Sequence, residues 1–462
     1  MNPTNPMFSD ASRGQHRFRL TVAVTIGALL LAAVGLTVAN TLQGPRFLDA
    51  QINPDGAVEG AGERLILRVD QNIANVTADE VTVTPSVPVE PTSDGAALSL
   101  RFGDILRYAT TYEIVATVRS ATTGASSTLT YSFRTPDSAF YVLQRAALGA
   151  EAGASDQIVR GFIGSPGQMV VRKQPFIEEY AVADPVIAVV TSDGAGLGTL
   201  TVGPVDGSEP PQTIADNSVI GQLKSSGSAG ILGFVVTPLS DPDQARGGQL
   251  HLYDPVAGGK LIKVSGFDGK PLDPLDWTFV PGTTSIVAQL ADGSFYLVDP
   301  LYGTPTQPLG SHSRMYGFVP GSTTLIVDDN GDYKAIDLVT GATSALSAID
   351  LPEAAALHQL LALGGDKGYV GLLATQVGRS VRYSVAVISD QGVREIDAED
   401  PERSIESLCA SPNGQYLAVA KVLNDPLANA DASTPPNTTE FVDTATGRTH
   451  QDVAGSDINW CN

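Results

Sequence analysis

Residues 279–287 (FVPGTTSIV) and residues 318–326 (FVPGSTTLI) are two copies of one pattern, and the second copy starts 39 residues after the first. Each copy runs through an Asp/Gly turn into a second apolar stretch, which ends in Asp-x-x-x-Gly at 299–303 and at 337–341. A repeat of about 40 residues built from short strands and tight turns is typical of a β-propeller blade. Because one blade cannot bury both faces of its sheet, the repeat predicts neighbouring blades.

The rest of residues 138–462 contains further strand pairs that fit this pattern. They predict six blades, at 177–202, 231–258, 279–303, 318–341, 369–388 and 408–447. Three unplaced strand candidates precede them, at 140–143, 157–160 and 169–172, and one follows them, at 456–462. We expect these four to form a seventh blade that closes the ring with both ends of the domain, because an open ring leaves sheet edges exposed. A ring of six blades is the alternative.

The sixth predicted blade begins with Ser-Pro-Asn-Gly at 411–414 and continues into Leu417 and Ala418. This stretch resembles the Ser-Pro-Asp-Gly-x-x-Leu-Ala repeat of TolB-type, WD-like propellers, with Asn413 in place of Asp. The resemblance implies a fold and no activity.

The chain has two cysteines, Cys409 and Cys461, which fall at nearly the same place on the inner strands of successive blades in that alignment. We predict a disulfide between them. Closing a loop of 52 residues would contribute about 4 kcal/mol on the loop-entropy estimate. Two buried free thiols are the alternative, because the Cα atoms of a disulfide must lie within about 6.8 Å of each other.

Residues 44–137 alternate in the manner of short strands, broken by Asp, Gly, Pro or Ser clusters, and this spacing predicts a β-sandwich. The segment 106–112 (LRYATTY), Gly124 and the segment 131–136 (YSFRTP) resemble bacterial immunoglobulin-like (Ig-like) domains of surface-layer and envelope proteins. That resemblance implies a spacer or adhesive module.

The N-terminal region has a long apolar run. No charged residue occurs from Leu20 to Pro45, whereas Arg13, Arg17 and Arg19 precede the run. We therefore predict an uncleaved signal-anchor, with a cytoplasmic tail at 1–19 and a transmembrane helix at 20–41. This places the protein in the plasma membrane as a single-pass protein whose bulk lies outside the cytoplasm. A cleaved signal peptide is the alternative.

Composition excludes some classes of function. Fifty acidic residues against 28 basic ones give a net charge of −22, which repels nucleic acid. The histidines are scattered, and neither they nor the cysteines show the spacing of metal ligands. We expect no catalytic residue, no cofactor and no metal from these patterns.

Two long connections, each between a second and a third predicted strand, are candidates for a binding face. Their candidate residues are Asp241, Asp243, Arg246, Asn424, Asp425 and Asp431. The sequence thus predicts an all-β envelope protein in which an Ig-like stalk carries a seven-bladed propeller. We expect the propeller to act as a protein-binding or scaffolding platform for another envelope or secreted protein. The alternative is a propeller enzyme, a hydrolase or lyase, with an acidic site at the mouth of the channel.

Overall fold

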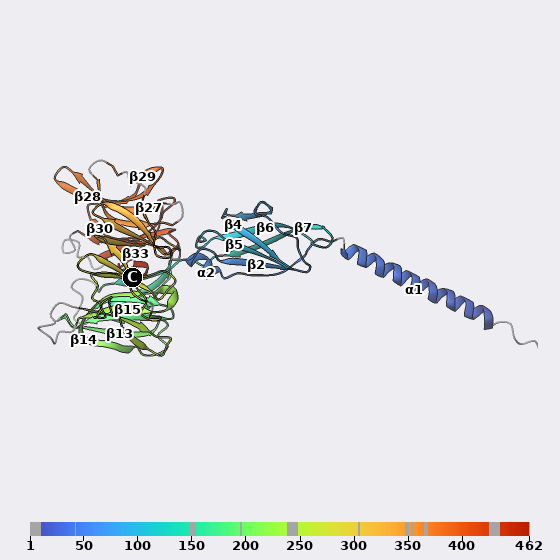
Figure 1. Cartoon of the computed structure of the whole chain (residues 1–462), viewed down its shortest axis with the longest axis horizontal. Coiled ribbons are helices and arrows are strands. Elements are labelled where there is room, and N and C mark those ends of the chain that lie inside the picture. The colour runs from blue at the N-terminus through green and yellow to red at the C-terminus, as the bar shows by residue number, and fades with distance from the viewer. Residues whose placement is uncertain are drawn as a thin grey trace, which may run out of the picture. The chain divides into compact units, whose positions relative to one another are not determined.

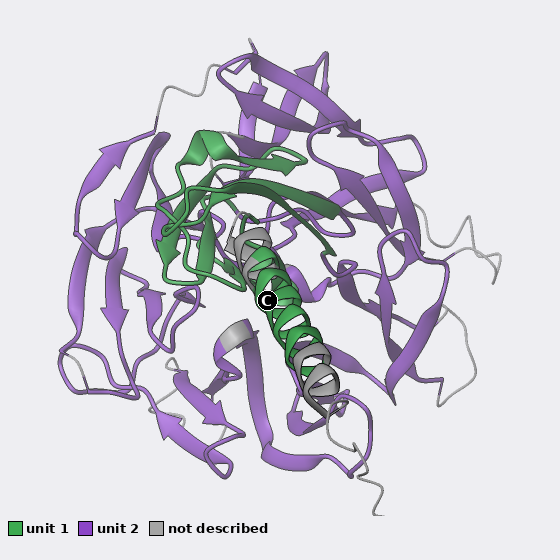
Figure 2. Cartoon of the chain, turned by 90° about the vertical axis from the view of Figure 1, so that its right-hand side faces the viewer, with its two compact units in different colours: residues 1–57, 62–104, 111–134 green, residues 58–61, 105–110, 135–462 purple. Residues whose placement is uncertain are grey.

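The computed structural model describes the backbone of residues 11–41, 43–146, 154–194, 196–237, 248–303, 305–346, 351–352, 355–364, 368–424 and 435–461. Side chains are described for the same residues except 11–17, 34, 36–41, 228 and 461. The chain divides into two compact units, which Figure 2 shows in different colours. Unit 1 comprises Met1–Ala57, Gly62–Asp104 and Thr111–Arg134, and unit 2 comprises Val58–Ala61, Ile105–Thr110 and Thr135–Asn462.

The N-terminal helix α1 (Ala11–Thr41) corrects one sequence-based prediction. Among the described residues, no helix combines the length and the apolar character that crossing a membrane requires. The predicted transmembrane helix at 20–41 is therefore contradicted, and so are the part of the predicted fold and the single-pass membrane localisation that rest on it.

The rest of unit 1 is built from two antiparallel sheets (Figure 1). One sheet has the order β1 (Phe47–Gln51), β2 (Arg64–Val69), β5 (Ala97–Phe102), β4 (Val89–Asp94), and the other has the order β3 (Val81–Thr84), β6 (Thr111–Arg119), β7 (Ser126–Arg134). Two short helices, α2 (Pro54–Glu59) and η1 (Ala78–Glu80), accompany them.

The inner faces of these two sheets pack against each other. Phe102 of β5 and Phe133 of β7 have ring centroids 6.1 Å apart, and Tyr112 stacks on Phe133 at 5.6 Å. Burial alternates along β2, β3, β5 and β6, as expected where one face of a sheet meets the core and the other meets water. The sandwich architecture thus agrees with the strand pattern, whereas the Ig-like resemblance stays a prediction.

Unit 2 consists of antiparallel sheets that stand around a common centre (Figure 2, purple). Six blades of four strands follow one another along the chain, and β14 (Gln212–Ser225) is shared between the first two. Blade 1 consists of β11 (Ile177–Ala183), β12 (Val186–Ser192), β13 (Gly198–Pro204) and the first half of β14, and blade 2 consists of the second half of β14, β15 (Leu232–Thr237), β16 (Gln249–Asp254) and β17 (Lys260–Lys263). Blade 3 consists of β18 (Asp276–Phe279), β19 (Ile286–Gln289), β20 (Ser294–Val298) and β21 (Gln307–Ser311), and blade 4 of β22 (Arg314–Phe318), β23 (Thr324–Asp329), β24 (Asp332–Asp337) and β25 (Thr343–Ala345). Blade 5 consists of β26 (Ala355–Ala362), β27 (Tyr369–Val377), β28 (Ser380–Ser389) and β29 (Gly392–Ala398), and blade 6 of β30 (Arg403–Ala410), β31 (Tyr416–Leu423), β32 (Asn437–Asp443) and β33 (Thr449–Ala454). A short helix, η2 (Gly227–Ala229), follows β14. This sheet order is that of a β-propeller.

The repeated sequence pattern forms the repeated turns of these blades. Pro281 and Gly282 link β18 to β19, and Gly282 has φ of +72°, as the third position of a type II turn requires. The Asp-x-x-x-Gly pattern closes the turn after the third strand. In blade 2, for example, Asp254 Oδ1 accepts the N–H groups of Val256 and Ala257 at 3.0 and 2.9 Å. The Pro-Gly and Asp-x-x-x-Gly patterns therefore repeat because each forms a turn through contacts among a few consecutive residues.

A seventh blade closes the ring. Its sheet has the order β10 (Gln168–Gln174), β9 (Asp156–Phe162), β8 (Ala139–Gln144), and Ser456 pairs with Leu143 of β8 through two main-chain hydrogen bonds of 2.9 and 3.0 Å. The C-terminal residues thus stand where the innermost strand of this blade belongs, as the blade count predicts. They form a single bridge followed by the short helix η4 (Asn459–Cys461), where the sequence pattern predicts a regular strand.

The Ser-Pro-Asn-Gly turn of blade 6 receives residues 105–110, which also belong to unit 2. Asn413 is 3% exposed, and its Nδ2 donates to the carbonyl oxygen of Leu106 at 3.0 Å. Gln415 Oε1 accepts the N–H of Tyr108 at 2.7 Å, and Arg107 Nη2 lies 2.9 Å from Asp443 Oδ2. Asn413, which replaces the Asp of the TolB-type pattern, therefore binds residues 105–110 to this turn through its N–H group. An aspartate carboxylate has no N–H to donate to Leu106.

We predict that Asn413→Asp lowers the free energy of unfolding by about 1–3 kcal/mol, because it leaves the Leu106 carbonyl without its donor and sets a negative charge against it. Thermal and urea unfolding would measure the change. Asn217→Asp, at an exposed asparagine of β14 with φ of +48°, is the matched control and should leave stability within about 0.5 kcal/mol of wild type. Equal stability of the two variants would contradict the assigned role.

Cys409 is buried on β30, and it is not a free thiol. The side chain of Cys461 lies outside the described residues. The predicted pairing of these two cysteines therefore stays a prediction.

Alkylation tests this pairing directly. We expect that the denatured, unreduced protein takes up no thiol-alkylating reagent and that the reduced protein takes up two equivalents, one for each cysteine in the chain. Intact-mass measurement reads both states, and a peptide map identifies the linked pair. Two alkylated cysteines without reduction would refute the disulfide.

Candidate functional site

Five of the innermost strands of the propeller contain an irregularity beside its central channel. The pairing register shifts inside β11, β14, β22, β26 and β30, at the residues between Ile177 and Glu179, Gly221 and Lys224, Met315 and Gly317, Leu357 and Gln359, and Ile405 and Ser407. A β-bulge bends its strand and re-aims the side chains beside it. The bulges therefore help to determine which side chains of these strands point toward the next blade.

In β11 and β26, the side chain of the residue that follows the bulge hydrogen-bonds to the main chain of a neighbouring blade, a contact that we call a clasp. Glu179 accepts the N–H groups of Gln222 and Leu223 at 3.2 and 2.7 Å. In the same position of β26, Gln359 donates to the carbonyl oxygen of Leu408 at 3.0 Å and accepts its N–H at 3.2 Å. Gln359 also lines the channel cavity, and the hydrogen bonds of both side chains hold neighbouring blades together.

A second polar link joins blades 2 and 3. Lys224 Nζ lies 2.9 Å from Asp276 Oδ1 and donates to the carbonyl oxygen of Trp277 at 2.6 Å. Its ammonium also lies 5.8 Å from the centroid of the Trp277 ring. The charge of Lys224 is thus matched by a carboxylate from the adjacent blade.

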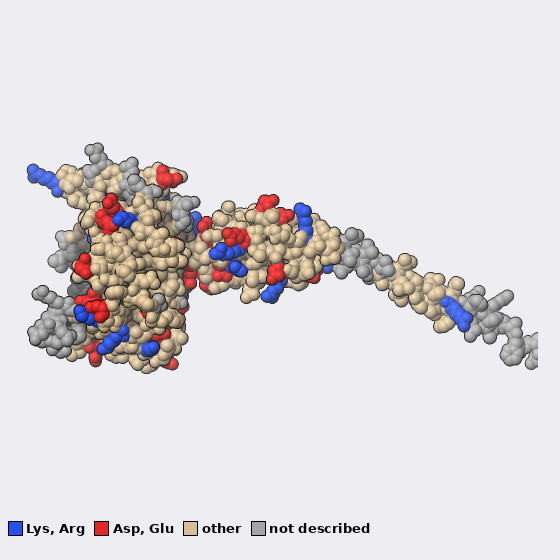
Figure 3. All heavy atoms as spheres, in the orientation of Figure 1, with Lys and Arg blue, Asp and Glu red and all other residues tan. Residues whose placement is uncertain are grey.

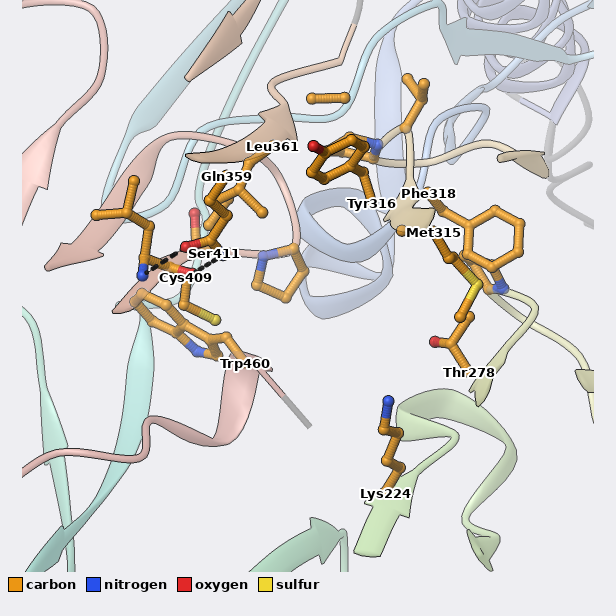
Figure 4. A pocket seen from close by; sticks show the side chains of 18 of the residues that line it. Lys224, Thr278, Met315, Tyr316, Phe318, Gln359, Leu361, Cys409, Ser411 and Trp460 are labelled. Carbon is orange, nitrogen blue, oxygen red and sulfur yellow. Dashed lines mark hydrogen bonds between the residues drawn. The ribbon is translucent and has the colours of Figure 1, made fainter. Parts of the chain in front are cut away.

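The channel contains a cavity of about 720 Å³, within the usual size range of small-molecule sites (Figure 4). Its walls come from the innermost strands β14, β18, β22, β26 and β30 and from the C-terminal residues. The side chains that Figure 4 labels are Lys224, Thr278, Met315, Tyr316, Phe318, Gln359, Leu361, Cys409, Ser411 and Trp460. Most of these groups are apolar, aromatic or already hydrogen-bonded within the fold, which suits binding better than proton transfer.

Acidic groups gather around Arg145 next to this cavity. Arg145 Nη1 lies 3.5 Å from Asp156 Oδ2, and Nη2 lies 3.9 Å from Asp457 Oδ2. Burial raises the pKa of the Glu406 carboxyl, and the charge of Asp457 raises it further, while Arg145 acts in the opposite direction. Three carboxylates therefore accompany one guanidinium at this place.

The described histidines lie apart, as their sequence positions predict. His312 lies 2.8 Å from Asp329 through Nδ1, and His251, His358 and His450 each contact an aromatic ring elsewhere in the propeller. Within the ranges that the structure describes, no three His, Cys, Asp or Glu side chains are placed to hold a metal ion.

Of the six loop residues that the sequence predicts as a binding face, the structure describes one. Asp241, Asp243, Arg246, Asp425 and Asp431 lie outside the described residues. Asn424 is described, and it is tied to the preceding turn: its N–H donates to Glu402 O at 2.8 Å and its Nδ2 to Pro401 O at 3.1 Å.

The exposed hairpin of β27 and β28 was not predicted. It lies at the end of the blades where second strands lead into third strands, as do the two predicted loops. β27 and β28 have nine and ten residues, against four and five in β19 and β20, and Val377 pairs with Ser380 across a two-residue turn. Val377 and Val381 are 57% and 50% exposed. The sequence signal that could have found it is Gly378 with Arg379 between Val377 and Ser380, a two-residue turn within the predicted blade at 369–388.

The two valines point to opposite faces of this hairpin. Val377 lies opposite Ser380 and Val381 lies opposite Gln376, so the valines occupy positions of opposite parity in the pleat. Arg379 in the turn is exposed, and Arg382 Nη2 lies 2.9 Å from Glu395 Oε1. Figure 3 shows basic side chains at the end of the blades where this hairpin lies. We call residues 376–382 the hairpin tip.

Comparisons with known proteins give fold-level likeness only. No family model matches the chain, and no curated protein matches it. A solved putative 6-phosphogluconolactonase from Bacteroides fragilis is 12% identical, with 70% of this chain and 97% of that chain covered and a TM-score of 0.39. The β-propeller domain of the Trilobed protease from Pyrococcus furiosus is 11% identical, with coverage of 72% and 99% and a TM-score of 0.35. An oligogalacturonate lyase in complex with manganese is 12% identical, with coverage of 68% and 95% and a TM-score of 0.41. Scores this low carry no argument, and the fold rests on the sheet order described above.

We predict that Gln359→Ala lowers the free energy of unfolding by roughly 1–3 kcal/mol, because the N–H and C=O of buried Leu408 both lose their partner. Chemical denaturation would measure the loss. Gln391→Ala, at an exposed turn between β28 and β29, is the matched control and should be nearly neutral. A neutral Gln359→Ala would show that the clasp contributes nothing to the joint.

Proposed function

We propose that this chain is a protein-binding module and that its partner contacts the end of the propeller where second strands lead into third strands. The observation that carries the proposal is the hairpin tip, which exposes one valine on each of its faces. A two-stranded ribbon gains little stability by itself, so packing within this chain does not account for exposed valines there. A groove on a partner that takes in the ribbon would bury both.

The charge of the hairpin indicates which kind of partner surface would complement it. Residues 369–389 contain no Asp or Glu, whereas the whole chain has a net charge of −22. Arg382 is matched by Glu395 at 2.9 Å, so Arg379, exposed in the turn, is the residue that makes the hairpin tip locally basic on an acidic protein. A partner surface with an apolar groove and an acidic rim is complementary to it, and such complementarity also favours fast association.

The two long connections belong to the same proposal. The links from β15 to β16 and from β31 to β32 leave their blades at the same end as the hairpin tip, because all three join a second strand to a third. We propose that Asp241, Asp243, Arg246, Asp425 and Asp431 extend the contact face around the hairpin tip.

The test is crosslinking of the intact protein in extracts of its own cells, followed by capture and mass spectrometry. We expect a reproducible partner whose capture falls at least about tenfold with the double variant Val377→Ser/Val381→Ser, since contacts of this size contribute ~1–2 kcal/mol each. Purified partner and protein would then be compared by titration, with Arg379→Glu expected to slow association.

Val256→Ser is the matched control, because Val256 is 80% exposed in the turn from a third to a fourth strand, at the other end of the blades. Capture should survive this change. Loss of capture with Val256→Ser but not with the double variant would place the contact at the wrong end and refute the proposed face.

A propeller enzyme, a hydrolase or lyase, is the second candidate. The observation that favours it is the Glu406 carboxyl beside Asp457 and Arg145, whose pKa is raised by burial and by the charge of Asp457, because a raised carboxyl pKa is the direction that general acid catalysis requires. Turnover of a small substrate by the intact protein, together with failure of the crosslinking to recover any partner, would favour the enzyme over the binding module.

A further inference from the structure

The cavity in the propeller channel has a lining of unusual composition, independent of the hairpin tip. Four of its lining residues are charged, namely Glu59, Lys224, Asp276 and Asp457, so carboxylates outnumber the ammonium by three to one. Lys224 is already matched by Asp276 at 2.9 Å. The lining is therefore negative overall.

Aromatic side chains supply the other half of the lining. Tyr316, Phe318 and Trp460 line the cavity together with Met315 and Leu361 (Figure 4). The face of an aromatic ring carries partial negative charge and attracts cations, and a quaternary or primary ammonium is the usual partner of such a surface. Carboxylates and ring faces thus favour the same kind of ligand.

We propose that this cavity binds a small organic cation, an ammonium with an apolar body. The ammonium pairs with Asp457, whose side chain is 53% exposed and lies 3.9 Å from its nearest cationic neighbour, Arg145. The apolar body packs against Trp460, which Figure 4 shows on the opposite side of the pocket from Phe318.

The same residues disfavour other ligand classes. An organic anion would meet three lining carboxylates and one lysine, and that lysine is engaged by Asp276 and by the carbonyl oxygen of Trp277. The nearby Arg145 is shared between Asp156 and Asp457. A metal ion would need a set of three ligating side chains, which the described residues do not provide. Recognition through ring faces and one carboxylate requires neither.

The probe is phenethylammonium chloride, with phenylethanol as its neutral analogue and 3-phenylpropionate as its anionic one. Calorimetric titration of the full chain should show saturable binding of the ammonium and at least tenfold weaker binding of the two analogues. Tryptophan fluorescence gives a second reading, because the chain has two tryptophans and the other one, Trp277, is fully buried. The fluorescence change should disappear in Trp460→Phe.

Asp457→Asn is the decisive variant. Asp457 has φ of +56°, a conformation that Asn adopts as readily as Asp, so the fold should persist with an unchanged melting temperature. We expect about tenfold weaker binding of phenethylammonium, because one carboxylate–ammonium attraction is lost. Asp390→Asn, in the exposed turn between β28 and β29, is the matched control and should bind like wild type.

Three results would overturn the proposal: binding of 3-phenylpropionate or phenylethanol as tight as that of the ammonium, unchanged affinity in Asp457→Asn, or no saturable binding of phenethylammonium. None of these outcomes depends on whether the hairpin tip binds a protein, since the crosslinking variants leave the cavity unaltered.

Discussion

Ring closure is the constraint on which unit 2 depends. Each blade presents the edge of its inner strand to the channel and both sheet faces to its neighbours, so a gap anywhere would expose apolar surface and unpaired main-chain groups. The chain meets this constraint by joining Ser456 to Leu143, residues more than 300 positions apart, through two main-chain hydrogen bonds. Asn459 adds a third bond, from the N–H of Tyr141 to its side chain at 2.8 Å. The end of the chain is thus structural, and the cavity owes two of its lining residues to it.

The joints between blades combine apolar packing with a few polar contacts of fixed geometry. Trp277 is fully buried among the side chains of blades 2 and 3, while the clasps of Glu179 and Gln359 reach over the channel side of their joints. Apolar packing stabilises the joint between two blades but does not depend on direction. The clasps fix how the two blades are aligned, because each hydrogen bond must meet a particular main-chain group. Both kinds of contact are needed for the channel to keep a defined lining.

Local chemistry made the fold largely predictable. The turn at Pro281 and Gly282 and the turn that begins at Asp254 depend on a few consecutive residues, so their sequence copies mark the blades, and counting leftover strands predicts the closure at Ser456. The bulges were missed because they arise from the pairing register between neighbouring strands of one blade. The clasps were missed because they join residues of different blades, and residue patterns encode neither. The transmembrane prediction relied on an apolar run and on the arginines before it, and it was wrong because no described helix combines the length and the apolar character that a membrane span requires. The hairpin tip was missed because strand length was read only from apolar runs.

The clasps have a consequence for how such a channel can change over evolutionary time. Glu179 and Gln359 bind N–H and C=O groups, which every residue but proline supplies in full, so these contacts themselves place no demand on the side chains that receive them. Leu223 and Leu408 are constrained instead by their burial in the core. Substitutions at other lining positions, such as Thr278 and Leu361, can alter the inner wall of the ring while the joints persist. Such a scaffold can acquire new ligand preferences by ordinary point mutation, without first losing the architecture that presents them.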